Sequence, residues 1–214
     1  MDIAKVMTYR LILFDVDSTL IEQEVIDLLA AKTSHGDTVR DITRRAMAGE
    51  IDFNQALIER VALLKDLPES FLLDVLTDIT FSPGAISLIS QLRERNFKVG
   101  AVSGGFINVL EPLLHDLNLD FLQANKLEIR DSRLTGKLEG PIVNREMKRA
   151  ALLQFAHDCG IATEETIAVG DGANDLLMIQ AAGLGVSYVG KPILNQAADV
   201  VLSEPGLDVL LNYI

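Results

Sequence analysis

The stretch LILFDVDSTL, residues 11–20, places four large apolar residues directly before two carboxylates. A short apolar run that ends abruptly at polar residues is typical of a parallel strand buried on both faces. Asp15 and Asp17 then lie where this strand ends. Because they are two residues apart, an extended backbone projects both side chains in one direction. We therefore expect the two carboxylates to share a reacting centre.

Strands and helices alternate along most of the remaining chain. Further strands are predicted at four places, residues 98–102, 166–169, 184–186 and 199–202. A polar, alternating stretch at residues 126–140, with Asp131 and Ser132 as turn residues, predicts a small hairpin. Strands that alternate with helices pair in parallel through right-handed crossovers. The predicted fold class is therefore α/β, a doubly wound, mostly parallel, Rossmann-like sheet with a small helical cap insertion.

The insertion follows the first strand. From residue 22 to residue 76 the pattern is helical, with apolar residues three and four apart, as at Phe53 and Leu57. Asp52 can cap the helix that contains them. We expect a catalytic core made of residues 1–21 and 77–214 and a helical cap made of residues 22–76.

Composition limits the partners and the compartment. With 19 Lys and Arg against 31 Asp and Glu, the net charge is −12, which repels nucleic acid and anionic membranes. Cys159 is the only cysteine, so no intramolecular disulfide can form. Neither a signal peptide's apolar core nor a run of about 20 apolar residues occurs. We expect a cytoplasmic monomer or homodimer that binds a small molecule, with neither nucleic acid nor membrane as a partner.

Polar residues follow three predicted strands, at residues 15–19, 103–105 and 171–175. Each segment alone could merely cap the next helix. The carboxyl ends of parallel strands, however, meet at one edge of a sheet, where doubly wound folds bind their ligands. The three segments together therefore predict a single site.

The carboxylates of this site suit phosphoryl transfer. A carboxylate is ionised at neutral pH, so Asp15 or Asp17 can attack phosphorus without a paired base. The partner carboxyl can protonate the leaving alcohol and later take a proton from water. Ser103 and the backbone amides of Gly104 and Gly105 offer donors for phosphate oxygens. No catalytic histidine or cysteine is needed for this chemistry.

Charge balance adds a cation. Asp15, Asp17, Asp171 and Asp175 together carry −4 when ionised, and a phosphomonoester adds about −2. Unaided, such a site would repel its substrate. A hard divalent ion with oxygen ligands, most naturally Mg²⁺, together with one lysine would bridge carboxylate and phosphate. Lys148, on the predicted helix before Asp171, is our candidate, although an ordinary solvated helix lysine would look the same in the sequence.

The segments DVDST, SGG and GDGAND, with Lys148 between the last two, resemble the four signature motifs of the haloacid dehalogenase superfamily of phosphotransferases. The resemblance implies that Asp15 is the nucleophile that forms an aspartyl-phosphate and that Asp17 is the acid/base. It also implies that Ser103 and Lys148 stabilise the phosphate, with Gly104 beside them.

The same resemblance implies a Mg²⁺ site. Its ligands would be Asp15, Asp171 and the backbone carbonyl of Asp17. Asn174 and Asp175 would hold position beside the metal and the substrate. The helical insertion after the first motif matches the superfamily's first type of cap.

Three longer segments, residues 15–30, 44–68 and 168–186, resemble the phosphoserine phosphatase family more narrowly. That resemblance implies Mg²⁺-dependent hydrolysis of O-phospho-L-serine to L-serine and phosphate, the last step of serine biosynthesis. Glu24 would contact the substrate amino group, Arg60 its carboxylate, and Met47 and Phe53 would shield the pocket.

From the residues alone, a zwitterionic amino acid needs one anion and one cation at the pocket wall, and Glu24 and Arg60 supply such a pair. Without the resemblance, Glu24 would be interpreted as a first-turn helix charge, and Arg60 as a partner of Glu59 or Asp66 on an exposed face.

Other functions remain open. The same intermediate could pass its phosphoryl group to a second alcohol such as homoserine, or another small phosphomonoester could be the substrate. A non-catalytic sensor of a phosphorylated metabolite would tolerate losing Asp15 or Asp17, and both are present. A nucleotide kinase or dehydrogenase is not supported, because the sequence has neither a phosphate-loop string nor a complete dinucleotide fingerprint.

Overall fold

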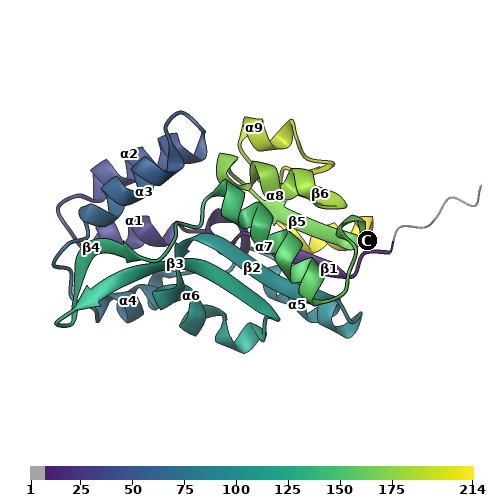
Figure 1. The fold of residues 1–214 in the computed structure, drawn as a ribbon, viewed down its shortest axis with the longest axis horizontal. Coiled ribbons are helices and arrows are strands. Elements are labelled where there is room, and N and C mark those ends of the chain that lie inside the picture. The colour runs from purple at the N-terminus through teal and green to yellow at the C-terminus, as the bar shows by residue number, and fades with distance from the viewer. Residues whose placement is uncertain (1–7) are drawn as a thin grey trace, which may run out of the picture.

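The computed structural model describes residues 8–214, and a seven-stranded sheet forms its centre (Figure 1). The strands are β1 (Leu11–Phe14), β2 (Lys98–Phe106), β3 (Phe121–Arg130), β4 (Arg133–Glu139), β5 (Thr166–Gly170), β6 (Leu184–Tyr188) and β7 (Val200–Leu202). Their order is β4-β3-β2-β1-β5-β6-β7, and every neighbouring pair is parallel except β3 and β4. The predicted doubly wound, mostly parallel sheet is confirmed.

Helices cover both faces of this sheet. They are α5 (Ala85–Glu94), α6 (Ile107–Leu114), α7 (Arg145–Asp158), α8 (Leu176–Ala181) and the short α9 (Pro192–Asn195). Figure 1 shows α7 and α8 on one face and α5 and α6 on the other. Within residues 8–214, no helix combines the length and the apolar character that a membrane crossing requires.

The residues of β1 explain why the sheet has two cores. Leu11 and Leu13 belong to the apolar cluster that includes residues of α7 and α8, whereas Ile12 and Phe14 belong to the cluster that includes residues of α5 and α6. All four side chains are fully buried. Because burying one such side chain contributes about 1.5–3 kcal/mol, both faces of this strand hold it in place. Asp15, the next residue, is therefore fixed at the edge of the sheet.

The predicted hairpin is present as β3 and β4. Arg130 pairs with Arg133, and the two turn residues between them, Asp131 and Ser132, both have positive φ, 50° and 55°. Such a two-residue turn matches the twist of the strands that it joins. β3 begins at Phe121, five residues before the predicted start, because its first half also pairs in parallel with β2.

A group of helices lies at one end of the sheet (Figure 1). They are α1 (Val25–Ala30), α2 (Gly36–Met47), α3 (Phe53–Ala62) and α4 (Phe71–Asp74), with a 3₁₀ turn over Val75–Asp78. Asp52 caps α3 as predicted, since its Oδ1 accepts from the amide of Gln55 at 2.9 Å. The two connections to the sheet run side by side, because Ile21 and Phe81 form an antiparallel bridge. The segment after α3 is also joined to β4, because the amide of Asp66 donates to the carbonyl of Leu134 at 2.9 Å.

Candidate active site

Asp15 and Asp17 lie in a wide, irregular turn directly after β1. The turn spans Val16–Leu20 and is closed where the amide of Ile21 donates to the carbonyl of Val16 at 3.0 Å. Asp15 is 2% exposed, and its Oδ1 accepts from the amide of Val16 at 2.7 Å. Asp17 is 7% exposed, and its Oδ1 accepts from the amide of Val25, the first residue of α1, at 2.8 Å. The turn therefore presents both carboxylates at the edge of the sheet that the sequence predicts.

Lys148 is a fully buried cation between two carboxylates. It lies in the first turn of α7, and its Nζ is 2.7 Å from Asp15 Oδ1 and 2.6 Å from Asp175 Oδ1. Burial lowers the pKa of Lys148, but Asp15 and Asp175 outweigh burial and raise it well above its usual range. Lys148 is thus a permanent ammonium, and the alternative of a solvated helix lysine is wrong.

The loop after β5 brings in Asp171 and Asp175. Asp175 is fully buried, and its Oδ2 accepts from the amides of Asp171 and Gly172, each at 3.1 Å. One Asp175 oxygen therefore stabilises the loop by accepting from two of its amides, while the other accepts from Lys148 Nζ. This arrangement leaves Asp171 facing Asp15 across the edge of the sheet.

The acidic residues here fit a hard divalent cation. Ligand oxygens of Asp15, Asp171 and Asp175 lie within 4.8 Å of one another. Asp171 Oδ1 and Asn174 Oδ1 are buried and accept no hydrogen bond from any residue in the described range 8–214. Buried oxygens without donors are what an oxygen-coordinated ion would satisfy. The carboxylate of Asp17 lies outside this cluster, which leaves its backbone carbonyl as the atom that the resemblance assigns to the metal.

Crowding of these carboxylates in a buried place changes their acidity. Burial, reinforced by the charge of Asp175, raises the pKa of Asp15 well above its usual value and that of Asp171 to about 7. Burial also raises the pKa of Asp17, against the opposing effect of its hydrogen bonds from Val25 and Ser103. A bound cation would relieve the crowding at Asp15 and Asp171.

The segment at residues 103–105 lies against Asp17 and forms part of the pocket wall. Ser103 is fully buried; its hydroxyl donates to Asp17 Oδ2 at 2.7 Å and accepts from the amide of Gly105 at 2.7 Å. A Cβ on Gly105 would collide with the Asp17 carboxylate, and one on Gly104 would lie 2.8 Å from the ring of Phe53. Glycine therefore suits Gly105, where the Asp17 carboxylate is held in place by Val25 and Ser103, whereas a Cβ at Gly104 would have to displace the Phe53 ring.

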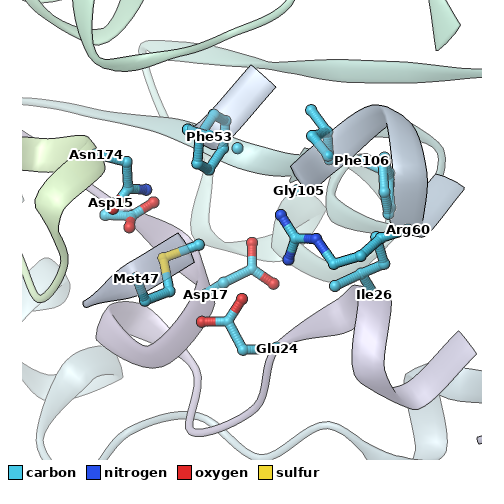
Figure 2. Close-up of a pocket in the computed structure, with 12 residues that line it drawn as sticks. Asp15, Asp17, Glu24, Ile26, Met47, Phe53, Arg60, Gly105, Phe106 and Asn174 are labelled. Atoms are coloured by element: carbon cyan, nitrogen blue, oxygen red, sulfur yellow. The ribbon is translucent and has the colours of Figure 1, made fainter. Parts of the chain in front are cut away.

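These segments enclose one pocket, together with side chains from α1, α2 and α3 (Figure 2). The pocket brings together nine of the predicted site residues: Asp15, Asp17, Glu24, Met47, Phe53, Arg60, Gly104, Gly105 and Asn174. Four predicted residues do not line it. Ser103 hydrogen-bonds to Asp17 and Lys148 pairs with Asp15, both of which line the pocket. Asp175 holds Lys148 and the amide of Asp171 from behind these residues. Ile26, Leu57 and Phe106 complete the lining.

Arg60 has no carboxylate partner. The side chain is 1% exposed, and no described Asp or Glu lies within 4.0 Å of its guanidinium. Its Nε donates to the carbonyl of Ala56 at 3.1 Å and its Nη1 to the hydroxyl of Thr43 at 3.0 Å. The alternative interpretation, in which Arg60 pairs with Glu59 or Asp66 on an exposed face, is wrong because α3 turns this residue into the pocket.

Glu24 lies at the other wall, opposite Arg60 across the Asp17 carboxylate (Figure 2). Its Oε1 accepts from the hydroxyl of Ser18 at 2.8 Å. Burial raises the pKa of Glu24 to about 8, and the charges of Asp17 and Asp171 add to the effect. An ammonium group bound beside Glu24 would favour its ionised form.

Sequence reasoning missed the residues that hold Arg60. The hydroxyl of Thr43, on α2, donates to Asp27 Oδ1 on α1 at 2.7 Å, and Thr43 is 3% exposed. The sequence offered one signal for Thr43, a polar residue on the apolar face of a predicted helix. This signal does not indicate which residues Thr43 bonds to. Ile26 and Leu57 had a weaker signal: Ile26 lies two residues after Glu24, and Leu57 lies three residues before Arg60 on the same face of α3.

Comparison with known proteins identifies a family of hydrolases that the chain resembles over most of its length. The family model of haloacid dehalogenase-like hydrolases matches residues 9–183. The phosphoserine phosphatase SerB2 of Mycobacterium tuberculosis is 50% identical over 204 residues, which are 95% of this chain and 50% of that protein. A phosphoserine phosphatase of Streptococcus thermophilus is 48% identical over 197 residues, 92% of each chain. The chain thus spans about half the length of the first relative and nearly all of the second.

A solved structure gives the same result. A phosphoserine phosphatase that carries an analogue of its phospho-aspartyl intermediate superposes with a TM-score of 0.93 at 40% sequence identity. The match covers 97% of this chain and 99% of that one. Both the sheet and the helices at its end are therefore similar in the two proteins.

Proposed function

The chain belongs to the haloacid dehalogenase-like hydrolases, and we propose that it hydrolyses O-phospho-L-serine to L-serine and phosphate. One observation carries this proposal: a single pocket contains a buried carboxylate beside a buried lysine and, at its other wall, an unpaired buried guanidinium with a carboxylate across from it. The first pair suits a phosphate ester, and the second suits the carboxylate and the amino group of an amino acid.

Asp15 acts as the nucleophile. Its Oδ1 is held by Val16 and Lys148, whereas no described residue bonds to Oδ2, which is therefore the free oxygen. Oδ2 attacks phosphorus, the bond from phosphorus to the serine oxygen breaks, and the serine oxygen takes a proton from Asp17. The raised pKa of Asp17 favours the protonated form that this step needs.

Water completes the cycle. It attacks the phosphorus of the aspartyl-phosphate, the bond between phosphorus and the Asp15 oxygen breaks, and Asp17 takes the proton of the water. Inorganic phosphate leaves, and both carboxylates return to their starting forms. Ser103 supplies a neutral donor beside Asp17, and Lys148 supplies fixed positive charge beside Asp15 throughout.

Mg²⁺ is the cofactor that we propose for the acidic cluster. Asp15, Asp171 and the carbonyl of Asp17 would hold it, with Asn174 and Asp175 beside them. When bound, the ion supplies charge neutralisation between the carboxylates and the phosphate.

The cap that we propose comprises residues 22–76, and the core comprises residues 1–21 and 77–214. The paired connections support this boundary: the amide of Glu22 donates to the carbonyl of Thr80, and the amide of Ser82 to that of Leu20, each at 2.9 Å. Met47 and Phe53 then close the pocket from the cap side and exclude water until serine leaves. We place the activity in the cytoplasm, in the last step of serine biosynthesis.

A substrate panel tests the proposal. Phosphate release with Mg²⁺ should give the highest kcat/KM for O-phospho-L-serine, against phosphoethanolamine, which lacks the carboxylate, and p-nitrophenyl phosphate, which lacks both groups. Asp15→Asn should abolish turnover, and Arg60→Ala should weaken phosphoserine far more than the aryl ester. Equal losses on both esters would remove Arg60 from the substrate site.

The same assay separates the rival reactions. Added homoserine followed by ³¹P NMR would reveal transfer to a second alcohol as a new phosphate ester. A higher kcat/KM for any other small phosphomonoester would assign the protein to that substrate and overturn the proposal.

A further inference from the structure

We propose that Asn125 is a positioning residue that fixes the loop of Ser103–Gly105 relative to Lys148, and so sets the site that receives the phosphoryl group. The inference rests on the proposed function only in that the pocket takes a phosphate. It does not depend on which ester delivers it.

The argument begins with the pairing of β2 and β3. Ser103 is opposite Ala124, but the next pair along is Phe106 and Asn125. β2 therefore advances three residues while β3 advances one, and Gly104 and Gly105 bulge out of the sheet. Both glycines line the pocket. A bulge of this kind re-aims the backbone and interrupts the ladder of main-chain hydrogen bonds.

Asn125 takes the place of the interrupted ladder. Its side-chain Nδ2 donates to the carbonyl of Gly104 at 2.8 Å, and its Oδ1 accepts from the amide of Val143 at 2.8 Å. The residue is 2% exposed. The Gly104 carbonyl is thus held in one orientation by a residue that does not itself line the pocket.

The second partner leads directly to Lys148. Val143 is 2% exposed and precedes Asn144, whose side chain caps α7 by accepting from the amide of Met147 at 3.0 Å. The amide of Lys148 donates to the carbonyl of Asn144 at 2.8 Å. One carboxamide therefore joins the pocket-lining glycines to the first turn of the helix that carries the lysine.

Asparagine is suited to this task because it offers a donor and an acceptor on one short planar group. An apolar residue would leave two buried backbone groups unsatisfied. A carboxylate would still accept from Val143 but would place an acceptor against the Gly104 carbonyl. A protonated carboxyl would again offer a donor and an acceptor.

The chain provides a matched control in a residue of α6 that is tied to the same strand. The side chain of Asn108 accepts from the amide of Leu127, two residues along β3 from Asn125, at 2.9 Å. Asn108 does not line the active-site pocket. Asn108→Ala therefore removes a comparable tie from side chain to strand at a place where the phosphate is not bound.

The test compares Asn125→Asp, Asn125→Ala and Asn108→Ala with the wild-type protein. Binding of inorganic phosphate with Mg²⁺ is measured by calorimetry, folding by thermal unfolding, and turnover by kcat/KM. We expect both Asn125 variants to bind phosphate about tenfold or more weakly at pH 8, the loss of one or two hydrogen bonds in a buried site. The preference for phosphoserine over p-nitrophenyl phosphate should stay within twofold, since Glu24 and Arg60 are untouched.

Asn108→Ala should lower the unfolding temperature but leave phosphate binding within twofold. Asn125→Asp should recover binding, relative to the wild type at each pH, as the pH falls and the introduced carboxyl gains a proton. Phosphate affinity within twofold of the wild type in Asn125→Asp at pH 8 would overturn the inference. The inference would also be overturned if the phosphate affinity of Asn125→Asp did not recover at lower pH. If the Asn125 variants did not fold, the residue would be structural, and the inference would again be wrong.

Failure of the proposed function has a different signature. A wild-type protein that binds inorganic phosphate but does not release it from phosphoserine would refute the substrate while leaving the role of Asn125 to be decided by the same binding series.

Discussion

Replacing Thr43 with valine removes one hydroxyl from the network that holds Arg60 and leaves the shape of the side chain nearly unchanged. In the folded protein this hydroxyl accepts from Arg60 Nη1 at 3.0 Å and donates to Asp27 Oδ1 at 2.7 Å. Since Arg60 is 1% exposed, water cannot replace the lost acceptor. The guanidinium would be left with its bond to the Ala56 carbonyl alone and would be free to leave its present orientation.

The cost can be bounded. A hydrogen bond to a charged group contributes about 1.5–3 kcal/mol, and a buried donor left unsatisfied costs a similar amount. If this cost falls on substrate recognition, about 1.4 kcal/mol corresponds to each tenfold loss. We therefore expect Thr43→Val to lower kcat/KM for phosphoserine about 10- to 100-fold, mainly through KM. Turnover of p-nitrophenyl phosphate, which has no carboxylate for Arg60, should change less than threefold.

Thr43→Ser is the control, because it keeps the hydroxyl and loses only a methyl group. Steady-state kinetics on both esters, with thermal unfolding to confirm folding, would complete the comparison. If Thr43→Val slowed the two esters equally, or if Thr43→Ser were as damaging as Thr43→Val, the hydroxyl would not act through Arg60, and the reasoning would be refuted.

Three other predictions concern the metal, the acidity and the backbone. EDTA should silence phosphate release and Mg²⁺ should restore it, because the crowded carboxylates would otherwise repel the substrate; full activity in EDTA would contradict the charge argument. Without metal or substrate, folding should raise the pKa of Glu24 from its ordinary value to about 8, so the stability that its protonated form contributes is lost as the pH rises through that window. The free energy of unfolding, measured by denaturation at several pH values, should therefore depend less on pH in Glu24→Gln than in the wild type. The same pH dependence in both proteins would contradict this prediction. Val189 is β-branched and 45% exposed, and its φ of 46° is a left-handed conformation that strains such a side chain. Val189→Gly should relieve this strain and raise the free energy of unfolding by about 0.5–1 kcal/mol. A lower free energy of unfolding would contradict the prediction.

Local pattern was enough to predict which edge of the sheet carries the candidate site. The run at residues 11–14 is apolar on both faces, which is typical of a central strand, and the structure places it between two helical layers. Once the sheet is parallel, the polar residues after β1, β2 and β5 must meet, and the structure brings Asp15, Ser103 and Asp171 to one edge. The hairpin followed from Asp131 and Ser132 for the same local reason, since its turn is defined by adjacent residues.

Contacts between distant elements could not be predicted in this way. Thr43, Asp27 and Arg60 come from three separate helices, and only the packing of α1, α2 and α3 brings them together. Arg60 is buried because α3 is rotated about its axis so that this residue faces the pocket. The sequence does not determine that rotation, since the neighbouring residue, Glu59, is also charged. The bulge at Gly104 is similar, because its carbonyl is satisfied by Asn125 on another strand.

The two buried cations of the site, Arg60 in the pocket wall and Lys148 behind Asp15, differ in a way that would separate the proposed catalysis from substrate recognition. Lys148 is neutralised inside the protein, since Asp15 and Asp175 both lie within 2.7 Å of its Nζ. Arg60 has neutral partners only, so its charge remains uncompensated at short range, and burial lowers its pKa. An uncompensated buried charge destabilises the folded protein, and a substrate carboxylate would offset that cost on binding. A phosphate ester without a carboxylate would gain no binding energy at Arg60. The unpaired guanidinium would therefore lower the stability of the free protein and favour small phosphomonoesters that carry a carboxylate.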